Sequence, residues 1–400
     1  MQACSRLLLI VIIVLTGLLT DRTTVFGRLV SVIAIWRHGD RAPGSLPYPK
    51  DRFDESYWPR GWDQLTNIGM EQAYELGEWI RVRYDGFISA DFNLKEVFMQ
   101  ASDSERSLET GAAVAAALFP PRNGSVWRRG LAWQPTPMHS SGLGRDDALL
   151  RPTSVACAAY DRVAAAENDA LYKSIDEDNG QLFRNLSTLT GMQVNTSNID
   201  DLYGITKEII HGLGPQPAWV TDELLAQILE LKRAIRVSFF NSPRKAYYRG
   251  GVLLGDWITK LQAASEADKK GDTKAFHKAV LYSSHDGTVS GLQYAMHVGN
   301  ELLVPYVACY IVELHHKEDN ADDYVVQLWY RNGTLNRLTV PGCAEDCPLA
   351  QFAELLKNQT IASVDELHEK CKETDSAPSI VNSALSSIVF LLFIRPFIIA

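Results

Sequence analysis

The chain has 400 residues, 46% of them hydrophobic, which is enough to bury one large core or two smaller ones. Its formal net charge is −9 and it contains no long basic run, so we expect no nucleic-acid partner. Any site for an anion must therefore be a local basic pocket within an acidic surface.

Residues 1–27 have the features of a secretory signal peptide. Arg6 precedes an unbroken apolar run over 7–15, and Val25-Phe26-Gly27 offers a cleavage site before Arg28. A retained signal anchor is the alternative, and the short apolar run disfavours it. We therefore expect the chain to enter the secretory pathway and to be extracellular, on the cell surface or lysosomal.

The first predicted strand is the apolar run over 29–36, which has the composition of a fully buried strand. It ends in Arg37-His38-Gly39-Asp40-Arg41, which would place cations at the carboxyl edge of a sheet. Open α/β sheets bind ligands at that edge. A proline-rich loop over 42–62 follows, and loops of this length usually line a site. Thr66 is the expected cap of the next helix.

Two further strand–loop–helix units repeat this layout. A strand over 96–100 leads to a helix over 108–118, with Ser102 or Asp103 as its N-cap and Arg106 in its first turn. A strand over 279–282 ends at His285 and Asp286, and Thr288 leads the helix over 289–297. The three units would deliver their polar groups to one edge of the sheet.

The remaining segments predict an inserted helical block and an antiparallel sheet edge. We expect a strand over 130–138, helices over 155–175, 223–241 and 250–267, and an irregular polar stretch over 195–214. Strands over 308–314, 324–330 and 335–340 follow, the last two joined at Asn332-Gly333, and a helix over 348–357 ends the fold. We interpret 28–143 and 271–372 as an α/β core and 144–270 as a helical cap.

The C-terminal tail, 373–400, has the layout of a GPI-attachment signal. Small residues and a polar spacer precede an apolar stretch over 387–394, which Arg395-Pro396 interrupts. Attachment to a membrane by a single span and simple secretion remain alternatives, although Arg395 would be costly within a span. Five sequons predict N-glycosylation at Asn123, Asn185, Asn195, Asn332 and Asn358.

Five cysteines remain once Cys4 is removed with the signal peptide, so one thiol should be unpaired. Cys343 and Cys347 are close together in a turn-like stretch. An oxidising compartment favours a disulfide between them over a metal clip. The histidines outside the three units are scattered without metal-ligand spacing, so we predict no metal site and no cofactor.

The groups at the three strand ends suit phosphoryl transfer. Arg37, Arg41 and Arg106 match the geometry of phosphate oxygens, and His38 or His285 could supply a nucleophilic nitrogen. Neighbouring arginines should lower the pKa of such a histidine and keep its lone pair free in acid. Asp286 is the candidate that protonates the leaving oxygen, and low pH should keep it protonated.

The segment from Arg37 to Pro43 resembles the RHGxRxP signature of the histidine acid phosphatases, a branch of the histidine phosphatase superfamily. The resemblance continues through 61–72, through Ser102-Asp103-Ser104-Glu105-Arg106 and through Ser284-His285-Asp286, and it covers about residues 29 to 372. It implies a mixed, mostly parallel sheet flanked by helices, as in the phosphoglycerate mutase-like fold, with a smaller helical cap.

The same resemblance implies a role for each residue of the site. His38 would be the nucleophile that forms a phosphohistidine, and Asp286 the proton donor. Arg37, Arg41, Arg106 and His285 would bind the phosphate, and neither a metal nor a cofactor would be needed. The resemblance also implies a homodimer and a disulfide between Cys157 and Cys371. The usual partner of Cys309 is missing here, which predicts a free, buried thiol.

The sequence therefore predicts a secreted or surface-anchored acid phosphatase that acts on phosphate monoesters. A phytase or inositol polyphosphate phosphatase is an alternative that would need a more basic pocket, and no extra basic residues adjoin the signature. A non-enzymatic surface glycoprotein that retains the fold is the other alternative, against which the intact set of candidate site residues counts.

Overall fold

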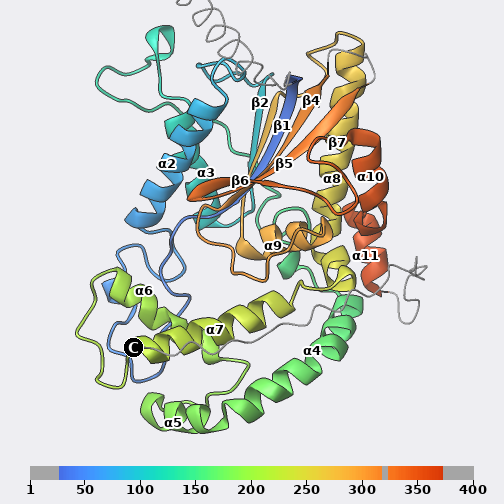
Figure 1. Ribbon diagram of the computed structural model, residues 1–400. Helices are drawn as coiled ribbons and strands as arrows, with labels where there is room; N and C mark the ends of the chain where they lie inside the picture. Colours follow the sequence, from blue (N-terminus) through green and yellow to red (C-terminus); the bar gives the residue numbers. More distant parts are fainter. Residues whose placement is uncertain (1–26, 318–322, 373–400) are drawn as a thin grey trace, which may run out of the picture.

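The computed structural model describes residues 27–317 and 323–372, which form a seven-stranded sheet with helices on both faces and a further group of helices beyond one end of the strands (Figure 1). Residues 1–26 of the predicted signal peptide and the predicted C-terminal anchor lie outside these residues. Within the two ranges, no helix combines the length and the apolar character needed to cross a bilayer.

The sheet is mixed, as the resemblance implied. Its strands run in the order β2-β3-β1-β4-β5-β6, with β7 paired to β5. Neighbouring strands are parallel among β2, β3 and β1 and antiparallel elsewhere, so two of the six pairings are parallel. The expectation of a mostly parallel sheet was therefore wrong, because the hairpins after residue 308 add antiparallel strands at one edge. The strands are β1 (Arg28–Arg37), β2 (Val97–Ala101), β3 (Ala279–Ser284), β4 (Cys309–His316), β5 (Tyr324–Asn332), β6 (Thr334–Leu338) and β7 (Cys347–Pro348).

The helices divide between the two faces of the sheet and the region beyond its end (Figure 1). The α-helices are α2 (Asn67–Arg83), α3 (Glu105–Leu118), α4 (Ala158–Asp178), α5 (Gly180–Thr190), α6 (Gly204–Ile210), α7 (Asp222–Ser238), α8 (Pro243–Lys269), α9 (Asp286–Ala295), α10 (Leu349–Leu356) and α11 (Val364–Lys372). Short 3₁₀ turns cover Glu55–Tyr57, Asn123–Ser125, Pro152–Ser154, Ile199–Tyr203 and Lys357–Gln359.

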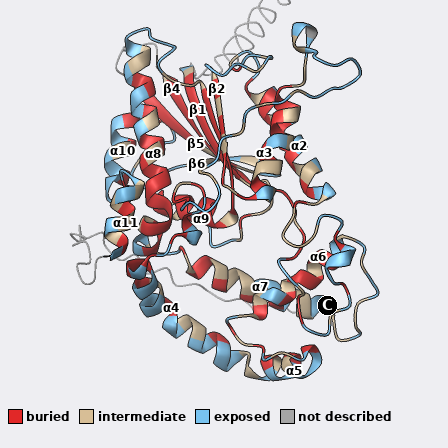
Figure 2. Cartoon of the chain, turned by 180° about the vertical axis from the view of Figure 1, so that it is seen from behind, coloured by how far each residue is buried: buried red, intermediate tan, exposed pale blue. Residues whose placement is uncertain are grey.

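Alternating side chains of the strands form a separate core on each face of the sheet. On β1, Val32, Ala34 and Trp36 pack with α2 and α3, whereas Ile33 and Ile35 pack with α8 and α9. Strands β1 to β5 are buried along most of their length, while α4 is largely exposed (Figure 2). Helix α8 lies within the predicted insert 144–270 but packs on the sheet, whereas α5 and α7 share an apolar cluster of their own.

Several expected elements differ in the structure. Residues 130–138 form no strand, since Pro135 and Pro137 remove donors that a ladder would need; one isolated bridge joins Gln100 to His139 nearby. The stretch 195–214 is not irregular throughout, because it contains a 3₁₀ turn and α6. The hairpin at Asn332-Gly333 and the Thr66 cap, which accepts a hydrogen bond from the Gly69 N–H, are confirmed.

Two helices begin at residues other than those predicted from the sequence. Helix α3 begins after Ser104, whose side chain makes no capping bond, and not after Ser102 or Asp103. Helix α9 begins at Asp286 with His285 as its N-cap residue. Thr288 is buried inside that helix, and its hydroxyl donates to the Leu150 carbonyl instead of capping the first turn.

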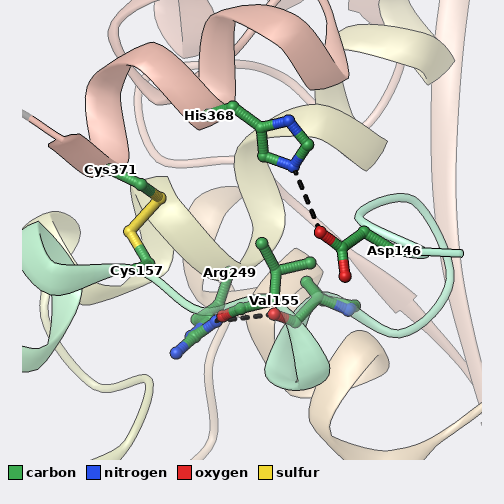
Figure 3. The surroundings of a disulfide bond; sticks show 7 residues. Asp146, Val155, Cys157, Arg249, His368 and Cys371 are labelled. Carbon is green, nitrogen blue, oxygen red and sulfur yellow. Dashed lines mark hydrogen bonds and ion pairs between the residues drawn. A yellow bond between two sulfur atoms is a disulfide. The ribbon is translucent and has the colours of Figure 1, made fainter.

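The cysteines pair in two disulfides. Cys157, just before α4, is bonded to Cys371 in α11, and the His368–Asp146 ion pair lies beside this bond (Figure 3). Cys343 is bonded to Cys347, and Cys309 is a free, buried thiol on β4. The first disulfide ties a residue near the start of the predicted insert to α11.

Candidate active site

The three parallel strands end at one edge of the sheet and bring their following residues together. Arg37 at the end of β1 is paired in register with Ser284 of β3, and Ala101 at the end of β2 is paired with Ser283. Beyond the strands, the His38 N–H donates to the Ser284 carbonyl at 2.8 Å. The rings of His38 and His285 consequently lie edge to face with centroids 5.4 Å apart.

His38 is buried and held in one tautomer by the backbone. Its Nδ1 lies 2.8 Å from the Gly39 carbonyl oxygen, which can only accept, so Nδ1 carries the proton and the lone pair of the neutral ring is on Nε2. Burial lowers the pKa of His38 well below its usual value, and the charges of Arg37 and Arg106 lower it further. The Nε2 lone pair is therefore available at acid pH.

Close backbone packing fixes the loop after His38. A Cβ on Gly39 would lie 2.2 Å from the Gly69 carbonyl oxygen, and a Cβ on Gly69 would lie 2.1 Å from the Asp40 carbonyl oxygen. Only glycine allows the first turn of α2 to approach the loop this closely. The Gly39 N–H also donates to the Thr110 hydroxyl of α3 at 3.1 Å, so both helices position the loop.

The three predicted arginines surround His38 and are held by different partners. Arg41 and Arg106 share Asp63, whose two oxygens lie 3.0 Å and 2.5 Å from their Nη1 atoms. Arg37 donates to the Val304 carbonyl at 2.6 Å and lies over the ring of Tyr306. Among the described residues, the buried Nε atoms of Arg37 and Arg106 have no hydrogen-bond partner.

His285 faces a hydroxyl on one side and a guanidinium on the other. Its Nε2 lies 2.7 Å from Ser102 Oγ, and its Nδ1 lies 3.4 Å from Arg106 Nη2. Because a guanidinium only donates, Nδ1 accepts and Nε2 donates to Ser102. Burial, reinforced by the charge of Arg106, lowers the pKa of His285 to about 3, so this ring stays neutral in acid.

Asp286 is ion-paired to a residue of the helical insert. Its Oδ2 accepts from Arg236 Nε of α7 at 2.8 Å. Burial by itself would raise the pKa of Asp286, but Arg236 and Arg37 hold that pKa well below its ordinary value. The expectation that low pH keeps Asp286 protonated was thus wrong, because the sequence did not reveal Arg236 as its partner.

All six predicted site residues line one cavity of about 1120 Å³: Arg37, His38, Arg41, Arg106, His285 and Asp286. Its other wall comes from the insert and carries Tyr172, Asp176, Asp200 and Lys232. Within the described part of the chain, no group of three or more His, Cys, Asp or Glu side chains could hold a metal ion. The charges and donors of the cavity suit an anion.

Sequence reasoning missed several residues that organise the site. Lys207 of α6 donates to the Arg41 carbonyl at 3.0 Å, and burial and the nearby arginines lower its pKa well below the usual value. His211, to which we assigned no role, lies with its Nε2 2.7 Å from Asp40, whose carboxylate also accepts from Thr66. Asp63 was included only as a member of the segment 61–72 that carries the family resemblance. Neither residue spacing nor composition indicated Lys207 or His211.

The predicted glycosylation sites differ in exposure. Asn185, Asn332 and Asn358 are exposed, whereas Asn195 is half-buried and lines the cavity. Their modification stays a prediction, as does that of Asn123.

Residues 28–331 match the histidine phosphatase superfamily (branch 2). The chain is 35% identical to prostatic acid phosphatase of Mus musculus over 340 residues, which cover 81% of this chain and 85% of the relative. It is 33% identical to lysosomal acid phosphatase of Rattus norvegicus over 375 residues, which cover 91% and 86%. The fold is similar to that of the phytase from Citrobacter braakii, with a TM-score of 0.60 at 16% identity, covering 85% of this chain and 99% of the phytase.

Proposed function

The chain belongs to branch 2 of the histidine phosphatase superfamily, and we propose that it is an acid phosphatase that hydrolyses phosphate monoesters through a phosphohistidine. The observation that carries this proposal is the setting of His38. Its Nδ1 proton is fixed by the Gly39 carbonyl, its Nε2 lone pair is free, and Arg37, Arg41 and Arg106 line the same cavity.

In the first chemical step, His38 Nε2 attacks the phosphorus of the bound ester. An N–P bond forms while the P–O bond to the alcohol breaks, and Asp286 gives its proton to the departing oxygen. The arginines stabilise charge on the phosphoryl oxygens, where positioning and electrostatics supply most of the rate. The Gly39 carbonyl keeps the Nδ1 proton in place as the ring becomes positively charged.

In the second step, the Asp286 carboxylate removes a proton from water, whose oxygen attacks the phosphorus. The N–P bond breaks, phosphate leaves, and His38 returns to its neutral tautomer. The ionised Asp286 that Arg236 and Arg37 favour is the form that this step requires.

The proton that Asp286 donates comes with the ester. Near and below pH 6, about the second pKa of a phosphate monoester, the substrate carries one proton. The arginines bind the dianion better than the monoanion, so the substrate proton passes to Asp286. The phosphate dianion then balances the surrounding cations in place of the Asp286 carboxylate. The proposed activity in acid is therefore compatible with an Asp286 that is ionised before the ester binds.

The test compares hydrolysis of p-nitrophenyl phosphate at pH 5 by the wild type and by His38→Ala. We expect the variant to lose at least about 10³-fold in kcat, because the nucleophile is gone. His297→Asn changes an exposed histidine outside the cavity and should retain the wild-type rate. Equal rates for wild type and His38→Ala would refute the nucleophile, and an inactive wild type would favour a binding glycoprotein.

Inositol polyphosphates are a second candidate substrate class, favoured by additional cations that sequence reasoning did not place in the site. Arg151, Lys232 and Arg236 line the cavity together with the predicted arginines. Asp176, Asp200 and Asp286 line it too and offset these charges, which favours simple monoesters. Comparing kcat/KM for inositol hexakisphosphate and glycerol 1-phosphate distinguishes the two, and we expect glycerol 1-phosphate to be the better substrate.

The two disulfides are consistent with an oxidising, secretory compartment. We further propose that the protein is secreted or held at the cell surface by its C-terminal tail, and that it forms a homodimer, as the family resemblance implies. These proposals concern the location and the assembly of the enzyme and do not affect the chemistry above.

A further inference from the structure

The Arg236–Asp286 pair joins the helical insert to the chemistry of the site. Arg236 lies in the last turn of α7, and its Nε is 2.8 Å from Asp286 Oδ2 in the first turn of α9. The side chains are 28% and 26% exposed, so the pair is half-buried at the cavity wall. Water therefore screens this ion pair only in part.

The Arg236 guanidinium is held firmly in this position. Its Cζ lies 5.3 Å from the ring centroid of Phe240, and Nη2 is 2.8 Å from where a Cβ on Gly287 would be. Thr153 approaches the same point to 2.9 Å, so the arginine fills the space beside the first turn of α9. The absence of a side chain at Gly287 is what allows this close approach.

We propose that Arg236 is a positioning residue that controls the protonation of Asp286, and through it the pH range in which esters with poor leaving groups are cleaved. The inference rests on the proposed function, because it concerns the step in which Asp286 protonates the leaving oxygen. Arg236 itself contacts Asp286 and need not touch the reacting atoms.

Other charged groups also face Asp286 and must be separated from Arg236. Arg37 ends β1 and His38 follows it, Arg106 comes from α3, Lys232 from α7, and His285 is the N-cap residue just before Asp286. Of these, Arg37 and Arg106 belong to the proposed phosphate-binding set, so their charge is engaged by the substrate, whereas burial and the arginines keep His38 and His285 neutral. Lys232, one turn before Arg236, is paired with Asp200 at 3.5 Å. Arg236 is thus the cation that stays on Asp286 when phosphate binds.

The pairing has opposite effects on the two chemical steps. A cation beside Asp286 favours the carboxylate, which is the base that water attack requires, and disfavours the acid that ester cleavage requires. Removing the charge should therefore extend ester cleavage to higher pH. A purely structural role would predict loss of activity at every pH.

The experiment follows the first-turnover rate at saturating ester between pH 4 and pH 8, since this rate reports protonation within the enzyme–substrate complex. With glycerol 1-phosphate, we expect the pH of half-maximal rate to be about one unit higher in Arg236→Met than in the wild type. With p-nitrophenyl phosphate, whose leaving group departs without a proton, we expect no shift. Arg236→Lys should restore the wild-type profile.

Three controls assign the shift. Lys232→Met removes a cation from the same face of α7 and should shift the profile by much less. Arg236→Gln removes the charge while keeping a polar head, and it serves as a second neutral variant if Arg236→Met folds poorly. In an Asp286→Asn background, Arg236→Met should produce no shift, because the titrating group is absent.

The results separate this inference from the proposed function. An equal loss at all pH values with both esters, or a shift that persists in the Asp286→Asn background, would overturn the role of Arg236 while leaving the phosphatase intact. Failure of the wild type to hydrolyse either ester would overturn both proposals.

Discussion

The two walls of the cavity are built differently. The sheet wall carries His38 and His285 directly after parallel strands, where backbone hydrogen bonds between neighbouring strands fix their positions. The insert wall carries Lys232 and Arg236 within α7, and their side chains lie in ion pairs with Asp200 and with Asp286. The rigid wall is suited to the chemistry and the helical wall to adjusting it.

The difference also appears in what each wall does to protonation. On the sheet wall, burial and arginines keep both histidines neutral. On the insert wall, Arg236 contacts Asp286, which gains and loses a proton in the proposed mechanism. The comparison predicts that substitutions on the sheet wall abolish turnover, whereas those on the insert wall change its dependence on substrate and pH.

Among the tests of this comparison, we expect substitution of Arg106 to have the largest effect on activity. We expect Arg106→Ala to lower kcat/KM for p-nitrophenyl phosphate by about 10²–10³-fold, because a donor to the phosphoryl oxygens is removed and Asp63 keeps one cationic partner. Lys232→Ala removes the same charge from the opposite wall and should cost less than about tenfold. Similar losses in the two variants would show that the walls do not differ as described.

A smaller expected effect concerns the pH dependence of the stability of the folded protein. Glu208 of α6 is buried, and burial together with Asp51 of the proline-rich loop raises the pKa of Glu208 to about 8. The folded state thus holds a proton that the unfolded state releases above its ordinary pKa, so this contribution to stability is complete in acid and is lost as the pH rises through about 8.

Glu208→Gln imitates the protonated form and should match the wild type in Tm at pH 5 but exceed it by about 2 °C or more at pH 9. Glu177→Gln, at an exposed position whose carboxyl lies outside this contact, should show no such difference between the two pH values. A Glu208→Gln effect that is the same at both pH values would contradict a proton held between the insert and the loop.

The sheet wall could be predicted from the sequence because its signals are local. An apolar run followed by polar residues and a helix start marks a strand end, and parallel strands bring such ends to one edge. The same logic failed where proline or helix geometry intervened, as in the expected strand over 130–138 and the expected start of α9 at Thr288. It also gave too much weight to parallel strands, since the antiparallel hairpins carry no site residues.

The insert wall could not be predicted because its signals are not local. Arg236 lies on an amphipathic helix among other charges, where a solvated side chain is the ordinary interpretation. Its partner Asp286 is 50 residues away in the sequence, and no spacing rule connects them. His211 and Lys207 are likewise recognisable only once α6 is seen to pack against the loop after β1.

The central claim is that His38 carries the phosphoryl group during turnover, and trapping that intermediate tests it directly. The enzyme is mixed with p-nitrophenyl phosphate, quenched in alkali within a turnover, digested and mapped by mass spectrometry. We predict a phosphoryl group on the peptide containing His38, labile to acid and absent from His38→Ala. A phosphoryl group on another residue, or hydrolysis at full rate with no phosphorylated enzyme, would contradict the account.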